Sequence, residues 1–341
     1  RMYIANATGC SSIWGNSSPS TPYTANKAGK GPAWSNSLFE DNAEFGYGML
    51  LAQQAIRDGL KAKVEEVAAN ENATAEVKAA CQEWLDTFGV GATNGAATDK
   101  LVAALENVDC PTCKDIVKNK DFLAKKSQWI FGGDGWAYDI GFNGVDHVLA
   151  SGKDINIMVF NTEVYSNTGG QSSKATPTGA VAQFAAGGKE VKQKDLAAIA
   201  MSYGYVYVAQ ISMGADMNQT IKAIAEAEAY PGPSLIIAYA PCINHGIKKG
   251  MAKAQTEEKL AVQSGYWNLF RFNPAAEGKK FSLDCKPATV DYQEFIKGEV
   301  RYTSLALKNP ARAEKLFAKA EQNAKDKYAY LEKLVTLYDE K

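Results

Sequence analysis

Histidine is scarce in this chain, since its 341 residues include only His147 and His245. Catalytic schemes that need a histidine base therefore have little material, and no pair of carboxylates stands out to replace one. We expect His147 to be a packing residue in a helix. His245 follows Cys242 closely, so we expect it to cap a loop or to tune a metal cluster through contact with the cluster's ligands.

The chain also lacks an excess of charge and lacks long apolar runs. It has 37 basic and 38 acidic side chains and a net charge of -1, which gives no long-range field for nucleic acid or for an anionic membrane. No apolar segment approaches the roughly 18 residues that a membrane span needs, and the N-terminus has no charged-then-apolar leader pattern. We therefore expect a soluble, cytoplasmic protein with no nucleic-acid or membrane partner.

Cysteine is too sparse for a disulfide scaffold. The six cysteines are scattered along the chain, at positions 10, 81, 110, 113, 242 and 285. Metal binding or redox chemistry is the alternative, and Cys110-Pro-Thr-Cys113 has the C-x-x-C spacing that thiol redox motifs and iron–sulfur ligands share. Buried cysteines acting as small hydrophobic residues are the plainer interpretation. The sequence begins at Arg1, so we expect a fragment, a processed product or one piece of a longer polypeptide.

The hydrophobic pattern predicts an α/β protein. Residues 5–48 show no sustained period and are expected as loops, and a helical pattern begins at Met49. Apolar runs and helical patterns then alternate, which predicts a mostly parallel sheet with helices on both faces. The expected strands are 128–132, 155–160, 205–211 and 234–240, and the expected helices are 137–150, 195–203, 216–229 and an amphipathic C-terminal helix.

A glycine-flanked aspartate, Asp134, follows the first of these strands. The polar stretch Asn161-Thr162-Glu163 comes 27 positions later, at the end of the next strand. A right-handed return through a helix would bring residues 161–167 beside the Asp134 turn. Mg²⁺ takes oxygen ligands, one or two from protein and the rest from phosphate or water, so this pairing predicts a diphosphate–Mg²⁺ site. A Gly-Asp-Gly alone is more often a plain turn, and the spacing and strand context favour the metal site.

This pattern resembles the thiamine diphosphate motif, a GDG followed by an Asn at a similar interval. The run GGDGWAYDIGFNGVDHVLASGKDINIMVFNTEVYSNTGGQSSKATPTGAVAQFAAGGK resembles the C-terminal thiamine-binding domain of pyruvate:ferredoxin oxidoreductase. The segments YIANATGCSSIWG, PYTANKAGKGPAWSNSLFEDNAEFGYGM and IIAYAPCINHG resemble it too. The resemblance covers nearly the whole chain and is weakest between about residues 58 and 120 and at the C-terminus.

The resemblance implies specific ligands. Asp134 would bind Mg²⁺ through its carboxylate, Thr162 through its hydroxyl and Val164 through its backbone carbonyl. Many thiamine enzymes have Asn-Asn where this chain has Asn161-Thr162. The Asn-Thr pair matches the oxidoreductase subgroup. Asn167 would lie beside the thiazolium and the 2-oxo acid as a catalytic residue; its alternative is a turn-former before Gly169-Gly170. The remaining expected cofactor contacts are Gly133, Gly135, Trp136, Glu163, Tyr165, Ser166 and Cys10.

For the cysteines, the resemblance implies that Cys10 and Cys242 bind a [4Fe-4S] cluster. Such a cluster needs four thiolates, and the family supplies the other two from a C-x-x-C upstream of where this chain begins. Cys110 and Cys113 lie in the segment that matches least, so they are discounted as ligands. We expect one thiamine diphosphate-binding domain over 1–341, made of a loop-rich, cluster-side segment (1–48), a helical insert (49–120), the cofactor-binding α/β core (121–250) and a C-terminal helical region (251–341).

The implied activity is oxidative decarboxylation of pyruvate to acetyl-CoA and CO₂, with electrons passed through [4Fe-4S] clusters to ferredoxin or flavodoxin. The implied partners are the enzyme's N-terminal pyrimidine-binding and ferredoxin-like domains, pyruvate, coenzyme A and a second copy in a homodimer. We expect the chain to be inactive without those domains. Two alternatives stay open: a non-redox thiamine diphosphate decarboxylase or synthase, which has no use for Cys10 and Cys242, and a non-enzymatic α/β binding module.

Overall fold

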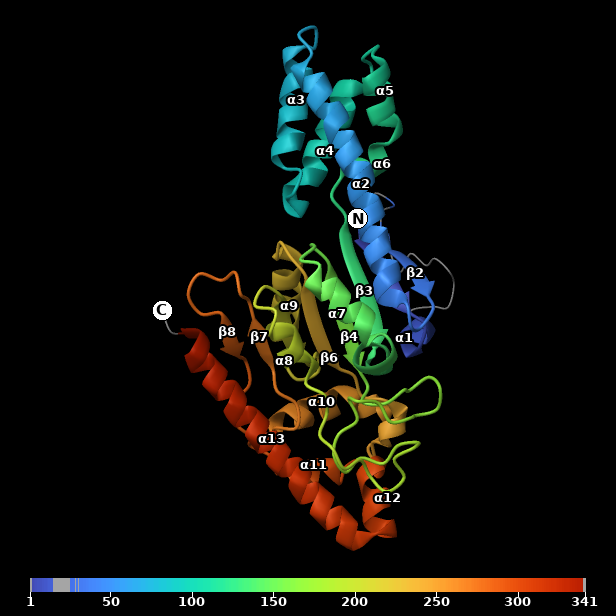
Figure 1. Cartoon of the computed structure of the whole chain (residues 1–341), viewed down its shortest axis with the longest axis vertical. Coiled ribbons are helices and arrows are strands. Elements are labelled where there is room, and N and C mark those ends of the chain that lie inside the picture. Colours follow the sequence, from blue (N-terminus) through green and yellow to red (C-terminus); the bar gives the residue numbers. More distant parts are fainter. Residues whose placement is uncertain (1, 15–24, 28, 30, 340–341) are drawn as a thin grey trace.

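The computed structural model describes residues 2–14, 25–27, 29 and 31–339. Its centre is one eight-stranded sheet in the order β2-β1-β3-β4-β6-β5-β7-β8 (Figure 1). The strands from β2 to β5 in this order are parallel, and β7 and β8 add an antiparallel edge. The mostly parallel α/β sheet predicted from the sequence is therefore confirmed. The strands are β1 (Met2–Ala7), β2 (Ala33–Ser37), β3 (Ser127–Gly133), β4 (Asn156–Asn161), β5 (Tyr207–Ile211), β6 (Ser234–Tyr239), β7 (Phe270–Phe272) and β8 (Phe281–Leu283).

Helices cover both faces of this sheet. The larger core packs α7, α8 and α13 against one face, and α9 packs on the other face over a smaller core that includes Tyr207 and Ala223. The helices of this body are α1 (Cys10–Trp14), α7 (Phe142–Ala150), α8 (Leu196–Met201), α9 (Met217–Ala229), α10 (Ala254–Gln263), α11 (Tyr292–Ile296), α12 (Val300–Lys308) and α13 (Pro310–Asp339). Two 3-10 turns, η2 (Ile243–His245) and η3 (Met251–Lys253), precede α10.

Capping residues set the limits of the predicted helices. Asp195 caps α8 by accepting a hydrogen bond from the Ala198 amide at 3.1 Å, and Gly204 follows the helix with a positive φ of 75°. The helix expected at 137–150 begins differently, as a π-helix, η1 (Gly135–Ile140), before α7. The Trp136 indole packs so closely on Gly141 that a Cβ there would lie 2.2 Å from the ring. This junction therefore requires glycine.

The expectation of loops over residues 5–48 was wrong at four elements: β1, α1, β2 and the start of α2. β1 and β2 pair in parallel at the edge of the sheet, and α2 (Asn42–Ala69) begins earlier than Met49. β1 is buried along its length after Tyr3, and its polar Asn6 donates to the Asn36 side chain at 2.8 Å. A short, fully buried strand has no apolar–polar alternation, so its period could not be seen in the sequence.

The helical insert has a hydrophobic core of its own. It is formed by the outer part of α2 with α3 (Ala75–Asp86), α4 (Gly91–Leu105), α5 (Pro111–Lys118) and α6 (Lys120–Leu123). Trp84, Leu101 and Ile116 are fully buried there, in a cluster separate from those of the sheet. Figure 1 shows this bundle projecting from one end of the body, joined to it by α2, which at 28 residues is about 42 Å long.

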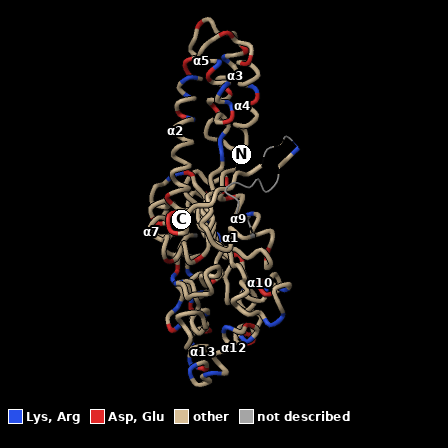
Figure 2. The backbone as a smooth tube through the Cα atoms, turned by 90° about the vertical axis from the view of Figure 1, so that its right-hand side faces the viewer, with Lys and Arg blue, Asp and Glu red and all other residues tan. Residues whose placement is uncertain are grey.

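The C-terminal region combines helices with the sheet edge. α13 buries the predicted stripe, including Leu316, Ala320, Leu331 and Leu334, against the body. β7 and β8 also belong to this region, which was expected to be helical throughout. Figure 2 shows acidic and basic residues interspersed over the described chain. Within its described residues, the protein has no helix with the length and hydropathy of a membrane span.

Candidate functional site

The carboxyl ends of β3 and β4 bring together the three predicted magnesium ligands. β3 and β4 are adjacent and parallel, so Asp134 and Thr162, which directly follow them, meet at the same sheet edge. The Thr162 hydroxyl oxygen lies 2.8 Å from Asp134 Oδ1 and 3.0 Å from the Val164 carbonyl oxygen. One hydroxyl proton cannot serve both acceptors at once. Three converging oxygens with a single proton between them are the arrangement that a bound cation would satisfy.

Asp134 is fully buried. Its Oδ1 also accepts from the Thr162 amide at 3.0 Å, and its Oδ2 accepts from the Ser173 hydroxyl at 2.5 Å. Burial raises the pKa of this carboxyl to about 7, against the lowering effect of these hydrogen bonds. Its hydrogen-bond partners among the described residues are the neutral donors of Thr162 and Ser173, so no cationic side chain balances this carboxylate when it is ionised.

The turn that presents the Thr162 and Val164 oxygens depends on Glu163. This residue has a φ of +62°, a conformation that side chains other than glycine rarely adopt and that costs on the order of 1–3 kcal/mol. Its buried carboxylate is held by Arg301 at 2.7 Å, by the Tyr266 hydroxyl at 2.6 Å and by the Gln193 amide at 2.9 Å. These contacts compensate the strained backbone. Glu163 therefore anchors the turn from behind.

A buried charge network continues from Glu163 beneath the turn. Arg301 donates to Glu299 at 2.7 Å, and Glu299 faces His245 Nδ1 at 3.6 Å. His245 in turn donates through Nε2 to the Thr162 carbonyl oxygen at 2.7 Å. All four side chains are buried. His245, which was expected to cap a loop or to tune a cluster, thus holds the backbone of Thr162.

A cavity of about 510 Å³ opens beside this turn. Thr162 and Val164 line it, whereas Asp134 is fully buried and is not among the lining residues. Cys10, on α1, and Cys242, which follows β6, both line it, although they are far apart in sequence. Ser166 donates to the Cys10 sulfur at 3.0 Å, and the Asn244 amide donates to the Cys242 sulfur at 3.4 Å. The two cysteines that the resemblance grouped together thus face one space, with polar hydrogens directed at each sulfur.

The other expected cofactor contacts divide into two groups. The larger group lies on the wall of the cavity and comprises Gly133, Gly135, Thr162, Val164, Tyr165, Ser166 and Asn167. Asn167 is exposed at the rim, and among the described residues its side chain has no hydrogen bond. Trp136 and Glu163 are not on the wall, because the indole is buried in the core and the carboxylate joins the network described above. Their side chains support the site from behind.

The structure adds residues that the sequence reasoning missed. Ser173 belongs to the Gly/Ser-rich loop after β4, where serines are too common to single one out. Arg301, Glu299 and Tyr266 lie more than 100 positions after Glu163. Their one sequence signal is two charged residues, Glu299 and Arg301, beside apolar Val300 and Tyr302. This was too weak to read as a buried ion network.

The donor set fits a hard divalent cation bound to a diphosphate. One carboxylate, one hydroxyl and one carbonyl are oxygen donors of the kind that Mg²⁺ takes from protein, and they leave positions for phosphate oxygens. At Gly135 a Cβ would lie 2.6 Å from the Tyr165 ring, so glycine lets the ring and the backbone form this wall together. A [4Fe-4S] cluster fits only in part, because two thiols face the cavity and four are needed.

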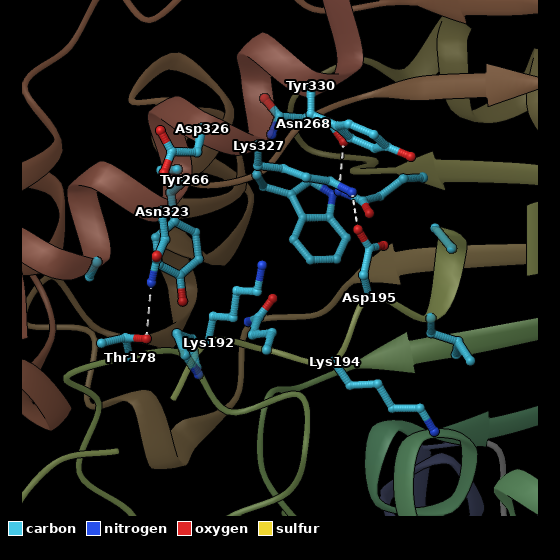
Figure 3. A pocket seen from close by; sticks show the side chains of 18 of the residues that line it. Thr178, Lys192, Lys194, Asp195, Tyr266, Asn268, Asn323, Asp326, Lys327 and Tyr330 are labelled. Atoms are coloured by element: carbon cyan, nitrogen blue, oxygen red, sulfur yellow. Dashed lines mark hydrogen bonds and ion pairs between the residues drawn. The ribbon is translucent and has the colours of Figure 1, made fainter. Parts of the chain in front are cut away.

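A second cavity, of about 440 Å³, lies between the 177–197 loop and α13 (Figure 3). An Asp195–Lys327 ion pair and a hydrogen bond of 3.3 Å from Asn323 to Thr178 connect its two sides. Tyr266 and Gln193 belong to its wall as well as to the Glu163 anchor. This cavity therefore adjoins the Glu163 side chain, and none of the residues that carry the three oxygens lines it.

Comparison with known proteins reveals the chain's relatives. Residues 117–238 match the thiamine pyrophosphate enzyme C-terminal TPP binding domain. The chain is 54% identical over 339 residues to a pyruvate-flavodoxin oxidoreductase of Klebsiella pneumoniae and 56% identical over 344 residues to a pyruvate:ferredoxin oxidoreductase of Moorella thermoacetica. Both alignments cover 98% of this chain. Over nearly its whole length, the chain is similar to one part of pyruvate:ferredoxin and pyruvate-flavodoxin oxidoreductases. It spans about 29% of the length of these two relatives.

One further relative and one solved structure also match the chain. A mitochondrial pyruvate dehydrogenase [NADP(+)] of Euglena gracilis is 48% identical over 332 residues, covering 95% of this chain and 18% of that protein. A 2-oxoglutarate:ferredoxin oxidoreductase structure from Magnetococcus marinus aligns with a TM-score of 0.38 and 16% identity, over 71% of this chain and 55% of that one. The family resemblance expected from the motifs is confirmed by the sequence relatives.

Proposed function

We propose that this chain binds thiamine diphosphate and Mg²⁺ as one part of an oxidoreductase that oxidatively decarboxylates pyruvate. The observation that carries the proposal is the convergence of three oxygens: Thr162 Oγ1 lies 2.8 Å from Asp134 Oδ1 and 3.0 Å from the Val164 carbonyl oxygen. The matched thiamine pyrophosphate domain includes all three residues. The names of the relatives support pyruvate as the substrate.

The residues of the site have different roles in this proposal. Asp134, Thr162 and Val164 hold the metal, Gly133 and Gly135 line the diphosphate, and Asn167 at the rim offers an amide to the substrate. Glu163 and His245 fix the backbone of the turn, so that its oxygens need no rearrangement when the metal binds. The bound thiamine would supply the electron sink for loss of CO₂, which the side chains of this chain cannot provide.

The cluster and the partners complete the proposal. Cys10 and Cys242 would supply two thiolates of a [4Fe-4S] cluster, and a separate segment of the enzyme the other two. Ferredoxin or flavodoxin would accept the electrons, as the names of the relatives suggest. Coenzyme A would accept the acetyl group. The remaining domains of the enzyme, homodimeric assembly and a cytoplasmic location belong to the same proposal. We expect the 341-residue chain alone not to turn over pyruvate.

Titration calorimetry of the chain with thiamine diphosphate, with Mg²⁺ or with a chelator, tests the metal site. We expect binding that depends on the metal, and we expect Asp134→Asn to weaken it by about tenfold or more, because the variant removes the one anionic ligand. Asp109→Asn, far away in the insert, is the matched control. Equal binding with and without Mg²⁺, or equal affinity in both variants, would contradict the site.

The intact enzyme tests the cluster and separates the non-redox alternative. We expect its iron–sulfur absorption band to weaken in Cys10→Ser and Cys242→Ser and to persist in Cys285→Ser. A non-redox thiamine diphosphate decarboxylase or synthase would show no such band, and its Cys10 and Cys242 variants would keep full activity.

A further inference from the structure

Cys110 and Cys113 form a chemically asymmetric thiol pair in the helical insert, away from the site described above. Both are free thiols, Cys110 half-buried and Cys113 with 2% of its surface exposed. Cys110 precedes α5, and its sulfur accepts a hydrogen bond from the Cys113 amide at 3.3 Å. The loop before α5 lies at the end of the insert farthest from the sheet (Figure 1).

The first thiol is arranged to ionise. The Cys113 thiol donates to the Cys110 sulfur, and together with the backbone amides of Cys113 and Thr112 this lowers the pKa of Cys110. Pro111 occupies the first position of the helix, where no amide hydrogen is needed. The neighbouring Asp109 carboxylate, which would oppose a thiolate, is paired with Lys114 at 2.5 Å.

The second thiol is arranged to stay protonated until it is needed. Burial, followed by the hydrogen bond to Cys110, raises the pKa of Cys113 to about 12. The next thiol in this core, Cys81, is fully buried, and burial raises its pKa to about 11. Metal binding is not supported, because no group of three His, Cys, Asp or Glu side chains among the described residues is placed to hold an ion. An accessible nucleophile thus lies beside a shielded resolving thiol.

We propose that Cys110 and Cys113 are a redox-active dithiol that forms a reversible intramolecular disulfide by exchange with a disulfide-containing thiol compound. In the first step the Cys110 thiolate attacks one sulfur of the compound, forming a mixed disulfide and releasing one thiolate. In the second step Cys113 loses its proton and attacks the Cys110 sulfur, which closes the protein disulfide and releases the second thiolate. The protein loses two electrons and two protons, and the compound is reduced to two thiols.

The experiment equilibrates the chain in glutathione buffers of graded oxidation, quenches it with acid, alkylates the free thiols and maps them by mass spectrometry. We expect oxidised glutathione to remove two alkylatable thiols and to link Cys110 to Cys113, and dithiothreitol to restore both. Cys113→Ser should stop at a mixed disulfide of glutathione with Cys110, whereas Cys110→Ser should form neither product. Cys285→Ser is the matched control and should behave as the wild type.

Alkylation rates measured on the wild-type chain test the proposal without relying on variants that could fail to fold. We expect iodoacetamide to modify Cys110 before the other five cysteines and at least tenfold faster than Cys113. The proposal is overturned if both thiols remain alkylatable in the most oxidising buffer, if oxidation links Cys113 to Cys81, or if glutathione attaches to Cys113 rather than Cys110.

Discussion

Replacing Arg301 with methionine should destabilise the protein strongly, because Arg301 balances two buried carboxylates. It contacts Glu163 and Glu299 at 2.7 Å each, and its side chain is 1% exposed. Burial works to raise the pKa of Glu299, and Arg301 and then His245 outweigh it, so that the pKa lies below its ordinary value. Methionine would leave the Glu163 carboxylate without an ion-pair partner and the Glu299 carboxylate with only His245, at 3.6 Å. Removing one member of a buried ion pair costs about 3–5 kcal/mol, and we expect a loss of this size.

Arg312→Met provides the matched control. Arg312 pairs with Glu190 at 2.8 Å, but the two side chains are 37% and 67% exposed. Such surface pairs contribute about 0–1 kcal/mol. The two variants make the same chemical change, so the difference between their free energies of unfolding reports the effect of burying the arginine and its partners. A structural contribution from lost packing is common to both, although larger at the buried position.

Equilibrium unfolding in guanidinium chloride measures both variants, with tryptophan fluorescence as the signal. Trp267 lies in the same aromatic group as Tyr239 and reports on the body, whereas Trp84 reports on the insert. We expect the transition of the body to shift in Arg301→Met and hardly at all in Arg312→Met. Adding Glu299→Gln to Arg301→Met should recover part of the loss, since it removes one uncompensated charge. Losses that agree within about 0.5 kcal/mol for Arg301→Met and Arg312→Met would refute this account of the network.

Two further predictions concern glycines. Gly135→Ala would place a Cβ 2.6 Å from the Tyr165 ring on the cavity wall. We therefore expect calorimetry to show that thiamine diphosphate binding is weakened by about 1 kcal/mol or more. Gly89→Ala, which has open space around it, should leave the affinity unchanged. Within α2, Gly46→Ala would meet Ile130 at 2.5 Å and should lower the free energy of unfolding by about 1–3 kcal/mol. Gly48→Ala, two positions along and facing open space, should raise it by up to about 1 kcal/mol in the same denaturation assay, and equal signs for this pair would contradict the packing described.

The parts of the fold that could be predicted from the sequence are those with local signals. The strands before Asp134 and Asn161 are apolar runs bounded by glycine or polar residues, and Asp195 and Gly204 mark both ends of α8. Short strands such as β1 and β2 have neither a period nor a characteristic length, so they were missed. The π-helix after Asp134 depends on the contact between Trp136 and Gly141, which no propensity describes.

For the candidate site, the sequence predicted which three oxygens would lie together but not the residues that hold their backbone. Asp134 and Thr162 follow adjacent parallel strands, and that topology alone brings them together. Glu163 has a positive φ angle, and its side chain is held by Arg301 and Tyr266 from a distant part of the chain. Contacts of such long sequence separation arise only in the folded chain, so one sequence does not reveal them.

The position of the helical insert in the chain has a practical consequence. The chain leaves the body through α2 after β2 and re-enters at β3, and both of these strands pair with β1. The outgoing helix α2 packs against α6 and β3, and Arg57 of α2 donates to the Leu123 carbonyl oxygen at the end of α6, so the outgoing and returning segments lie side by side. The bundle between them buries its own apolar surface. A protein engineer could shorten this excursion, or graft a foreign helical hairpin onto the outer turns of α2, and still leave every ladder of the sheet intact.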